Sequence, residues 1–268
     1  MRAGVIGAGY VGVATAVALS RLGHRVMLVE MDPGRRETLQ AGDLPFHEPG
    51  LAAALAAEEA KGSLQIGAAC PSDVDVALIC VGTPGRPDGA IDAAPVHAAA
   101  AEVAAQVRAG AVIAIKSTVP PGTAARIRAA LGPRVGIVSN PEFLREGEAL
   151  RDALEPSRII IGACEAWAGE RIERLYAAIG SVVVRTTLTE AELIKLASNA
   201  MLAAKIGVAN ELADWARALG ASWEVVARGV SLDPRIGAAG LQAGLGFGGP
   251  CLPKDLAGTI AAAAAAGV

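Results

Sequence analysis

The segment AGVIGAGYVGVATAVALSRLGHRVMLVEMD begins at Ala3 and has four successive parts. They are an apolar run, a glycine turn, a helical stretch and a second apolar run. Gly7, Gly9 and Gly12 form a G-x-G-x-x-G pattern where the first apolar run gives way to helical periodicity, and Gly23 ends the helical stretch. This order predicts a strand, a crossover helix and a second strand parallel to the first. Such a βαβ unit directs the rest of the chain towards an α/β fold.

The glycine pattern has a physical basis if a dinucleotide binds at this turn. The first glycine permits the tight turn, the second lets the backbone approach a pyrophosphate, and the third allows the helix to pack closely on the strand. The positive end of the helix then faces the phosphates. Inside a βαβ unit the pattern predicts a dinucleotide site, and Tyr10 and Val11 of the same turn are further candidate cofactor-binding residues.

Glu30 ends the second apolar run, where an acidic side chain can accept hydrogen bonds from ribose hydroxyls. A carboxylate here repels a 2′-phosphate, so NAD is favoured over NADP as the cofactor. Asp32 is the competing candidate for this contact, and Arg35 is a candidate for the pyrophosphate. A solvated turn is the alternative interpretation of these residues.

Strand-like and helical segments continue to alternate to about residue 188. Short apolar runs bounded by turn residues are typical of buried parallel strands, and they occur in VDVALICVGTP, AVIAIKSTVP, RVGIVSNPEF, SRIIIGAC and SVVVRTT. Helical stretches lie between them at 94–108, 122–131 and 166–179. The pattern predicts a doubly wound, mostly parallel sheet of Rossmann type, and we expect residues 1–188 to form an NAD-binding domain.

A long helical segment follows in TEAELIKLASNAMLAAKIGVANELADWARALG. Thr189 and Glu192 have the spacing of a capping box, and helical periodicity continues to Gly220. A helix of about 30 residues spans roughly 45 Å, and we expect it to connect domains and to contact a partner subunit. A short helix from Trp223 and a glycine-rich loop complete a second, helical region at 189–268.

Charge and hydropathy limit the partners of the chain. The net charge is -3, the pI is about 5.7, and no stretch concentrates Lys and Arg, so we expect no nucleic-acid partner. The first strand-like run leaves no room for a signal peptide, and no apolar run approaches the ~18 residues of a membrane span. We therefore expect a cytoplasmic protein without a membrane partner. The cysteines show no paired C-x-x-C spacing, so no metal site is predicted.

Polar clusters follow several predicted strands or lie on the long helix, the places where α/β enzymes carry their sites. They are Thr83 in VGTP, Ser117 and Thr118 in KSTVPPGT, Glu142 and Glu146 in NPEFLREG, and Lys195 and Asn199 in ELIKLASNA. Lys195 and Asn199 lie four residues apart on one helical face, so an ammonium and an amide can converge on a single oxygen. A solvated helix face, and an ordinary capping role for the two glutamates, are the alternatives.

Cys251 lies in GFGGPCLPKD, closely followed by Lys254 and Asp255. The other cysteines, in apolar or alanine-rich surroundings, are Cys70, Cys80 and Cys164. A cysteine in such surroundings is usually buried and inert. Cys251 is either a nucleophile whose thiolate a neighbouring lysine favours, or a small buried apolar side chain.

Taken together and in this order, these strings resemble the UDP-glucose and GDP-mannose dehydrogenase family. The likeness runs through GAGYVG, VGTP, KSTVPPGT, NPEFLREG, EAELIKLASNA, LDPRIG and GFGGPCLPKD, and covers essentially the whole chain. The resemblance implies NAD-dependent, four-electron oxidation of the C6 alcohol of a nucleotide sugar to a carboxylate. In such enzymes a cysteine captures the aldehyde as a thiohemiacetal, and a thioester forms and is hydrolysed. The matching cysteine is Cys251.

The same resemblance assigns roles to the polar clusters. It implies that Lys195 and Asn199 stabilise the alkoxide and the thiohemiacetal oxyanion, a task for donors aimed at developing charge. It also implies that Asp255 and Thr118 hold a water. Glu142 is assigned to thioester hydrolysis, and Glu146 to the support of the water network. Thr83 and Thr118 are assigned to the cofactor, and Phe143, Leu144, Arg235 and Lys254 to the substrate. Arg235 matches a residue that reaches across a dimer, which implies a homodimer.

Departures from the family pattern leave alternatives open. Family members have a further C-terminal domain that binds the substrate's nucleotide, and we expect this chain to be a fragment or a naturally short relative without it. Leu252 after the cysteine is more typical of the GDP-mannose branch, and Glu30 replaces a more common aspartate. Two other functions remain: a two-electron dehydrogenase resembling the 3-hydroxyacid family and acting on a smaller substrate, and a non-catalytic NAD-binding module.

Overall fold

The computed structural model describes residues 1–249 and 251–268. The chain forms two compact units. The first consists of Met1–Pro84 and Asp92–Lys195, and the second of Gly85–Ile91 and Leu196–Val268.

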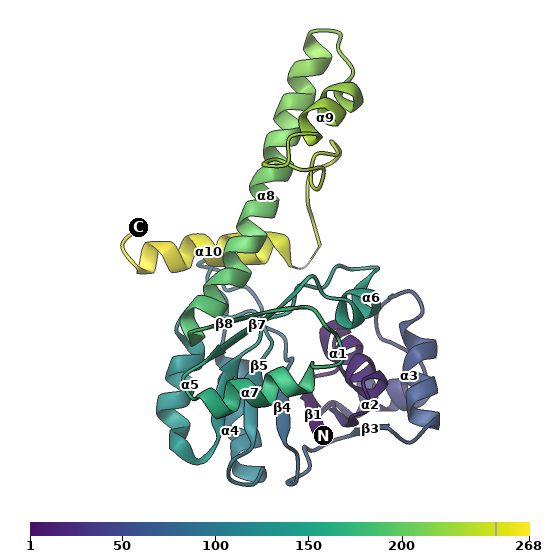
Figure 1. Ribbon diagram of the computed structural model, residues 1–268, viewed down its shortest axis with the longest axis vertical. Helices are drawn as coiled ribbons and strands as arrows, with labels where there is room; N and C mark the ends of the chain where they lie inside the picture. The colour runs from purple at the N-terminus through teal and green to yellow at the C-terminus, as the bar shows by residue number, and fades with distance from the viewer. Residues whose placement is uncertain (250) are drawn as a thin grey trace. The chain divides into compact units, whose positions relative to one another are not determined.

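An eight-stranded sheet forms the centre of the first unit (Figure 1). Its strands are β1 (Arg2–Ile6), β2 (Arg25–Val29), β3 (Leu64–Gly67), β4 (Val76–Ile79), β5 (Val112–Ile115), β6 (Gly136–Ser139), β7 (Arg158–Ala163) and β8 (Val182–Thr186). Their order is β3-β2-β1-β4-β5-β6-β7-β8, and every neighbouring pair is parallel except β6 with β7. The predicted doubly wound, mostly parallel α/β fold is confirmed.

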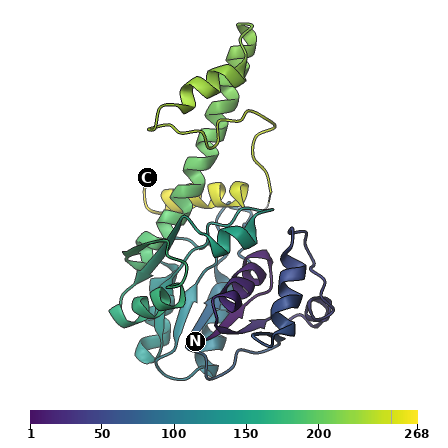
Figure 2. The ribbon, with the colours of Figure 1, turned by 45° about the vertical axis from the view of Figure 1, so that its right-hand side comes forward.

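Helices cover both faces of this sheet (Figures 1 and 2). One face carries α1 (Tyr10–Arg21), α2 (Pro33–Gln40), α3 (Leu51–Ala60), α6 (Ala149–Leu154) and α7 (Ala166–Leu175), and the other carries α4 (Ala94–Gln106) and α5 (Thr123–Leu131), which a 3-10 turn, η1 (Gly132–Arg134), follows. Successive strand residues point to opposite faces. In β4, Val76 and Leu78 therefore pack in the core under the first set of helices, and Ala77 and Ile79 in the core under the second.

The central strands are buried on both faces of the sheet, which explains why the sequence predicted them. Every residue of β4, β5 and β6 is buried, so these strands are continuous apolar runs rather than alternating ones. The helices predicted over 94–108, 122–131 and 166–179 form as α4, α5 and α7. The short elements α2, α3 and β3 were not predicted, and they connect the second strand to the fourth.

The strand order reverses between β1 and β4. From β1 the chain moves outward to β2 and β3, then returns to the other side of β1 and continues outward from β4. Ile6 pairs with both Val29 and Ile79, so the carboxyl ends of these three strands lie level with one another. The loops after β1 and β4 leave the sheet in opposite directions, which opens a crevice at this edge.

The beginning of α8 (Leu188–Ala218) corrects one prediction. Thr187 Oγ1 accepts a hydrogen bond from the Glu190 N–H (3.3 Å), and the Glu190 carboxylate accepts one from the Thr187 N–H (2.9 Å). These reciprocal bonds make a capping box, so the predicted box of Thr189 and Glu192 is wrong. Both pairs have the same T-x-x-E spacing, and Glu192 is unavailable as a cap because it is buried against another helix.

Helices make up most of the second unit. They are the remainder of α8, α9 (Trp223–Ser231) and α10 (Leu252–Ala265). A small apolar core joins α8 to α9 and contains Ala209, Ala213, Ala216, Trp223 and Leu241. Trp223 Nε1 also donates a hydrogen bond to Leu241 O (2.9 Å). Cys251 directly precedes α10, so Lys254 and Asp255 lie in the first turn of a helix rather than in a loop.

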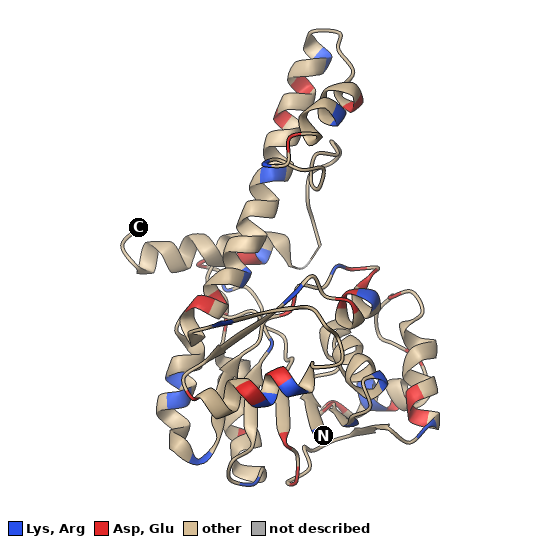
Figure 3. Cartoon of the chain, viewed as in Figure 1, with Lys and Arg blue, Asp and Glu red and all other residues tan. Residues whose placement is uncertain are grey.

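Figure 3 shows Lys, Arg, Asp and Glu interspersed along the helices, with the charges of α10 only near its beginning. Within the described residues, no helix is both long enough and apolar enough to cross a membrane. The same part of the chain contains no cluster of three or more His, Cys, Asp or Glu side chains arranged to hold a metal ion.

Candidate cofactor and active site

The glycine turn between β1 and α1 is tightly packed on its inner side. Gly7 has a φ of +99°, and a Cβ there would approach Cys80 O to 2.9 Å. A Cβ on Gly12 would overlap Gly7 O, so neither position admits a side chain. A Cβ on Gly9 would meet nothing within 4 Å, so the turn is open there, at the beginning of α1. This geometry fits a pyrophosphate group lying against bare backbone at the positive end of a helix.

A cleft of about 360 Å³ adjoins the glycine turn. Gly7, Glu30 and Met31 line it from the ends of β1 and β2, and Val81 from the end of β4. The opposite wall is α4, through Pro95, Ala98, Ala99, Glu102, Val103 and Gln106. Its mostly apolar lining, with the carboxylates of Glu30 and Glu102 on opposite walls, suits a purine ring and its ribose. Sequence reasoning missed the α4 wall, because only the folded sheet brings that helix beside β1.

The two acidic candidates near the cleft have different surroundings. Glu30 is mostly buried, and its carboxylate accepts hydrogen bonds from the N–H groups of Ala8 (3.3 Å) and Asp32 (3.0 Å). Arg35 Nε lies 3.9 Å from Glu30 Oε2. The Asp32 carboxylate instead caps α2, accepting the Arg35 N–H at 2.7 Å. Glu30 lines the cleft, whereas Asp32 satisfies a helix end.

We expect Glu30→Ala to weaken NAD binding about tenfold or more while the chain stays folded, since charge-assisted hydrogen bonds to a ribose are worth roughly 1.5–3 kcal/mol. Asp32→Ala is the matched control, because it removes a neighbouring carboxylate that caps α2. Titration calorimetry with NAD gives both affinities. A loss with Asp32→Ala and none with Glu30→Ala would transfer the ribose contact to Asp32.

Lys195 and Glu142 form a buried ion pair in the first unit. Lys195 Nζ lies 2.8 Å from Glu142 Oε1, and the two side chains are only 7% and 8% exposed. The other oxygen, Glu142 Oε2, accepts the Leu144 N–H (2.6 Å). The Phe143 ring lies beside this pair, its centroid 5.5 Å from Lys195 Nζ. The interpretation of Lys195 as part of a solvated helix face is therefore excluded.

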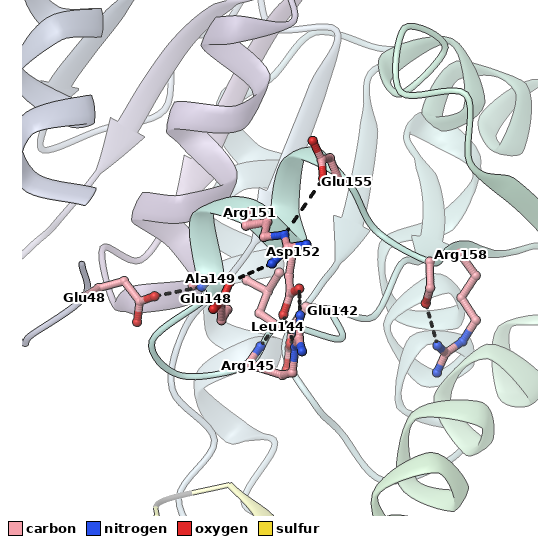
Figure 4. A network of polar contacts seen from close by, with 11 residues as sticks. Glu48, Glu142, Leu144, Arg145, Glu148, Ala149, Arg151, Asp152, Glu155 and Arg158 are labelled. Carbon is pink, nitrogen blue, oxygen red and sulfur yellow. Dashed lines mark hydrogen bonds and ion pairs between the residues drawn. The ribbon is translucent and has the colours of Figure 1, made fainter. Parts of the chain in front are cut away.

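The loop that carries Glu142 follows β6, at the same carboxyl edge as the glycine turn. Figure 4 shows how contacts hold this loop from two sides. Glu48 accepts hydrogen bonds from the N–H groups of Gly147 (3.0 Å) and Ala149 (2.7 Å). On the other side, Arg145 forms an ion pair with Asp152 at 2.6 Å, and this guanidinium lowers the pKa of the Asp152 carboxyl. The loop backbone is thus fixed on either side of Glu146, whose side chain is exposed.

Glu48 is a site residue that sequence reasoning missed. It lies in HEPG, where a single sequence shows only a charged residue before a turn. Its side chain is 6% exposed, and its two partners lie about a hundred residues further along the chain. A contact of that separation leaves no local pattern.

Three hydroxyl-bearing candidates follow β4 and β5. Ser117 Oγ donates to Val81 O (2.6 Å) and so ties the ends of the two strands together. Thr83 is buried and Thr118 is half-buried, both at the carboxyl edge of the sheet. Ser117 therefore has a structural role, while Thr83 and Thr118 remain candidates for ligand contact.

A second polar network lies within the second unit. Asn199 Nδ2 donates to Asp255 Oδ2 (2.7 Å), and Lys254 Nζ lies 2.7 Å from Asp255 Oδ1. Asp255 is 1% exposed and Asn199 is 8% exposed. Cys251 is half-buried directly before the same helix, α10, and its carbonyl accepts the Asp255 N–H (2.8 Å). The beginning of a helix favours a thiolate.

The remaining cysteines differ from Cys251 in exposure. Burial raises the pKa of the Cys70 thiol to about 11 and that of Cys80 to about 12, so both stay protonated at neutral pH. Apolar surroundings were expected for Cys164, but this residue is exposed. It lies after β7, in the turn that leads into α7.

Arg235 is one of the most exposed candidates, with 87% of its side chain accessible. Its guanidinium pairs with Asp233 of the same turn, with Nη2 2.6 Å from Oδ2. The described chain therefore presents Arg235 on an external turn of the second unit.

Comparison with known proteins gives matches over almost the whole chain. Residues 1–180 match the model of the NAD binding domain of the UDP-glucose/GDP-mannose dehydrogenase family, and residues 189–268 match that of its central domain. The UDP-glucose 6-dehydrogenase of Pseudomonas aeruginosa is 42% identical over 278 residues, covering 98% of this chain and 61% of that protein. The chain thus spans about three fifths of the length of the curated relatives it matches.

Solved structures give the same picture. A UDP-glucose dehydrogenase from the hyperthermophilic archaeon Pyrobaculum islandicum superposes with a TM-score of 0.94 at 41% identity, covering 100% of this chain and 65% of the other. A GDP-mannose dehydrogenase from Pseudomonas aeruginosa, solved as a ternary complex, has a TM-score of 0.83 at 32% identity and coverages of 100% and 64%.

Proposed function

The chain belongs to the UDP-glucose/GDP-mannose dehydrogenase family, and from this premise we propose that it oxidises the C6 primary alcohol of a nucleotide sugar to a carboxylate. Its cofactor is NAD. The observation that carries the proposal is the buried Lys195–Glu142 pair, which lies at the same sheet edge as the glycine turn. An ammonium and a carboxylate there can stabilise an oxyanion and activate a water.

NAD, when bound, supplies a two-electron oxidant for each of the two oxidations. The residues proposed to hold it are Gly7, Gly9, Tyr10, Val11 and Gly12 at the pyrophosphate, Glu30 at the ribose, Arg35 near the phosphates, and Thr83 and Thr118 at the sheet edge. An open Gly9 and a cleft lined by Glu30 support this assignment.

The first oxidation requires the C6 hydroxyl to lose its proton. In the proposed mechanism, Lys195 and Asn199 stabilise the alkoxide through N–H groups aimed at the oxygen. Burial supports this role, because a donor in a dry site has a stronger electrostatic effect than one in water. Asp255, with Thr118, is proposed to hold the water that takes part in proton transfer.

The second oxidation requires a nucleophile, because an aldehyde cannot lose two further electrons until a group adds to its carbonyl carbon. Cys251 Sγ is proposed to add there, which forms a C–S bond and a thiohemiacetal oxyanion. Lys195 and Asn199 stabilise this oxyanion as well. Oxidation gives a thioester, and Glu142 assists the water that breaks the C–S bond and releases the carboxylate and the thiol. Glu146 is proposed to support the water network around this step.

UDP-glucose is the substrate to test first. The relatives with about 40% identity are named as UDP-glucose dehydrogenases, and the corresponding solved structure superposes better than the GDP-mannose enzyme. Phe143, Leu144, Arg235 and Lys254 are proposed to contact the sugar nucleotide. We also propose a homodimer in which Arg235 reaches the partner's substrate, which the exposure of this side chain supports.

Counting NADH formed per sugar consumed tests this function. We expect two NADH per UDP-glucose and a uronic acid as the product, measured by absorbance and mass spectrometry. A ratio of one would favour the two-electron dehydrogenase on a smaller substrate. Tight NAD binding without reduction across UDP and GDP sugars would favour a non-catalytic module.

A further inference from the structure

Glu192 is a buried carboxylate on α8 that the proposed reaction does not use. Its side chain is 3% exposed. Oε2 accepts the Gly122 N–H (2.5 Å), and Oε1 accepts the Ala124 N–H (2.7 Å). These N–H groups belong to the beginning of α5, so this carboxylate fastens α8 to α5 with both oxygens.

Lys195 lies three residues beyond Glu192, on the same face of α8. Its ammonium is fixed by Glu142, from the loop after β6, at 2.8 Å. One face of α8 is therefore held at two successive turns, by α5 and by that loop. Gly122 also ends the loop that contains Thr118, so the Glu192 contact ties the Thr118 loop to the turn of α8 that precedes Lys195.

A residue that only filled the space between α8 and α5 would not need a carboxylate at position 192. Burial raises the pKa of Glu192 to about 7, although the N–H groups of Ala124 and Gly122 and the nearby Arg126 oppose this shift. An apolar residue of similar size would avoid the cost of burying a carboxylate. What a carboxylate adds is a pair of acceptors in one plane, which fixes the direction as well as the distance of the contact.

We propose that Glu192 is a positioning residue, whose two backbone contacts hold Lys195 and the Thr118 loop in the geometry that oxidation requires. This inference rests on the proposed function for the role of Lys195 and Thr118. Whether Glu192 keeps Lys195 in place can be measured from the accessibility of Lys195, without turnover. The positioning role of Glu192 and the proposed function can therefore fail separately.

The experiment compares Glu192→Gln with Glu58→Gln in the full 268-residue chain. A carboxamide has one acceptor, so it can satisfy only one of the two N–H groups. Glu58 is a matched control, because it is 2% exposed and accepts hydrogen bonds from Ser20 and Ser63 elsewhere in the first unit. Lys195 accessibility is read from amine labelling and mass spectrometry as a ratio to buried Lys116.

We expect Glu192→Gln to raise the Lys195 labelling ratio about tenfold and to lower turnover per NAD-binding site by a similar factor, since small misplacements near the reacting atoms are costly. The KM for NAD should rise by a smaller factor than turnover falls, because the glycine turn and Glu30 are untouched and Thr118 is the one proposed NAD contact in the loop that Glu192 holds. Glu58→Gln should change neither the ratio nor turnover. A purely structural role would lower thermal stability without altering turnover per NAD-binding site.

A Glu192→Gln chain that binds NAD and shows the wild-type labelling ratio would overturn the proposal. If this variant does not bind NAD, Glu192→Asp replaces it, since that change keeps the charge and shortens the side chain. For Glu192→Asp we expect a Lys195 labelling ratio about threefold above wild type. An unchanged labelling ratio would overturn the proposal. If the unaltered chain forms no NADH from any sugar, the proposed function fails while the labelling ratio still decides the role of Glu192.

Discussion

Cys251→Ser is expected to form uronic acid at least about 10³-fold more slowly than the unaltered chain, since the loss of a catalytic nucleophile costs this much or more. A serine hydroxyl adds to an aldehyde poorly without a thiolate's nucleophilicity, so oxidation should stop after one NADH, at the aldehyde. The measurement is the ratio of NADH to sugar, together with trapping of the aldehyde by hydroxylamine. NAD affinity should stay within about twofold, because the glycine turn and the cleft belong to the first unit.

Cys164→Ser is the matched control for this substitution. Cys164 is exposed and follows β7, so its thiol should be dispensable. Two NADH per sugar from Cys251→Ser would remove the thiohemiacetal from the mechanism. Loss of activity in Cys164→Ser alone would move the nucleophile to the end of β7.

Lys195→Ala is expected to lower turnover by about 10²–10³-fold, the usual effect of deleting a donor aimed at an oxyanion. It should also lower the free energy of unfolding by about 3 kcal/mol, because Glu142 is left as a buried carboxylate without its cation. Steady-state kinetics and urea unfolding separate the two effects. NAD affinity, from calorimetry, should be retained.

The double variant Lys195→Met with Glu142→Gln distinguishes catalysis from stability. It replaces both charges with neutral groups of similar size, so most of the lost stability should return while turnover stays low. Recovery of turnover along with stability would show that the pair has a structural role and that the ammonium does not act on substrate.

The fold was predictable because its signals are local. The three glycines of the first turn, the helix stop at Gly23 and the continuous apolar strands each follow from nearby residues. The helix ends were less predictable, as the two overlapping T-x-x-E pairs before α8 show. Which pair forms the cap depends on Glu192 finding partners on α5, about seventy residues earlier in the chain.

The candidate site was predictable only as a set of residue types. Sequence placed Lys195 on a helix and Glu142 after a strand, but the ion pair between them depends on tertiary packing that brings the loop after β6 to Lys195. The role of Glu48 and the α4 wall of the cleft depend on tertiary packing in the same way. The exposure of single side chains was also not predictable from residue type, since Cys164 is exposed and Lys195 is buried.

The joint between β6 and β7 has a consequence for hydrogen exchange. Only two residue pairs connect these strands, whereas every other pair of neighbours shares four or five. Beyond the end of β6 the connection continues through one side chain, as Asn140 Nδ2 donates to Ile160 O (2.8 Å). Separation of β7 and β8 together from β6 therefore breaks the fewest backbone pairings of any such division of the sheet, so the amides that join β6 to β7 are the ones that report a partial opening there.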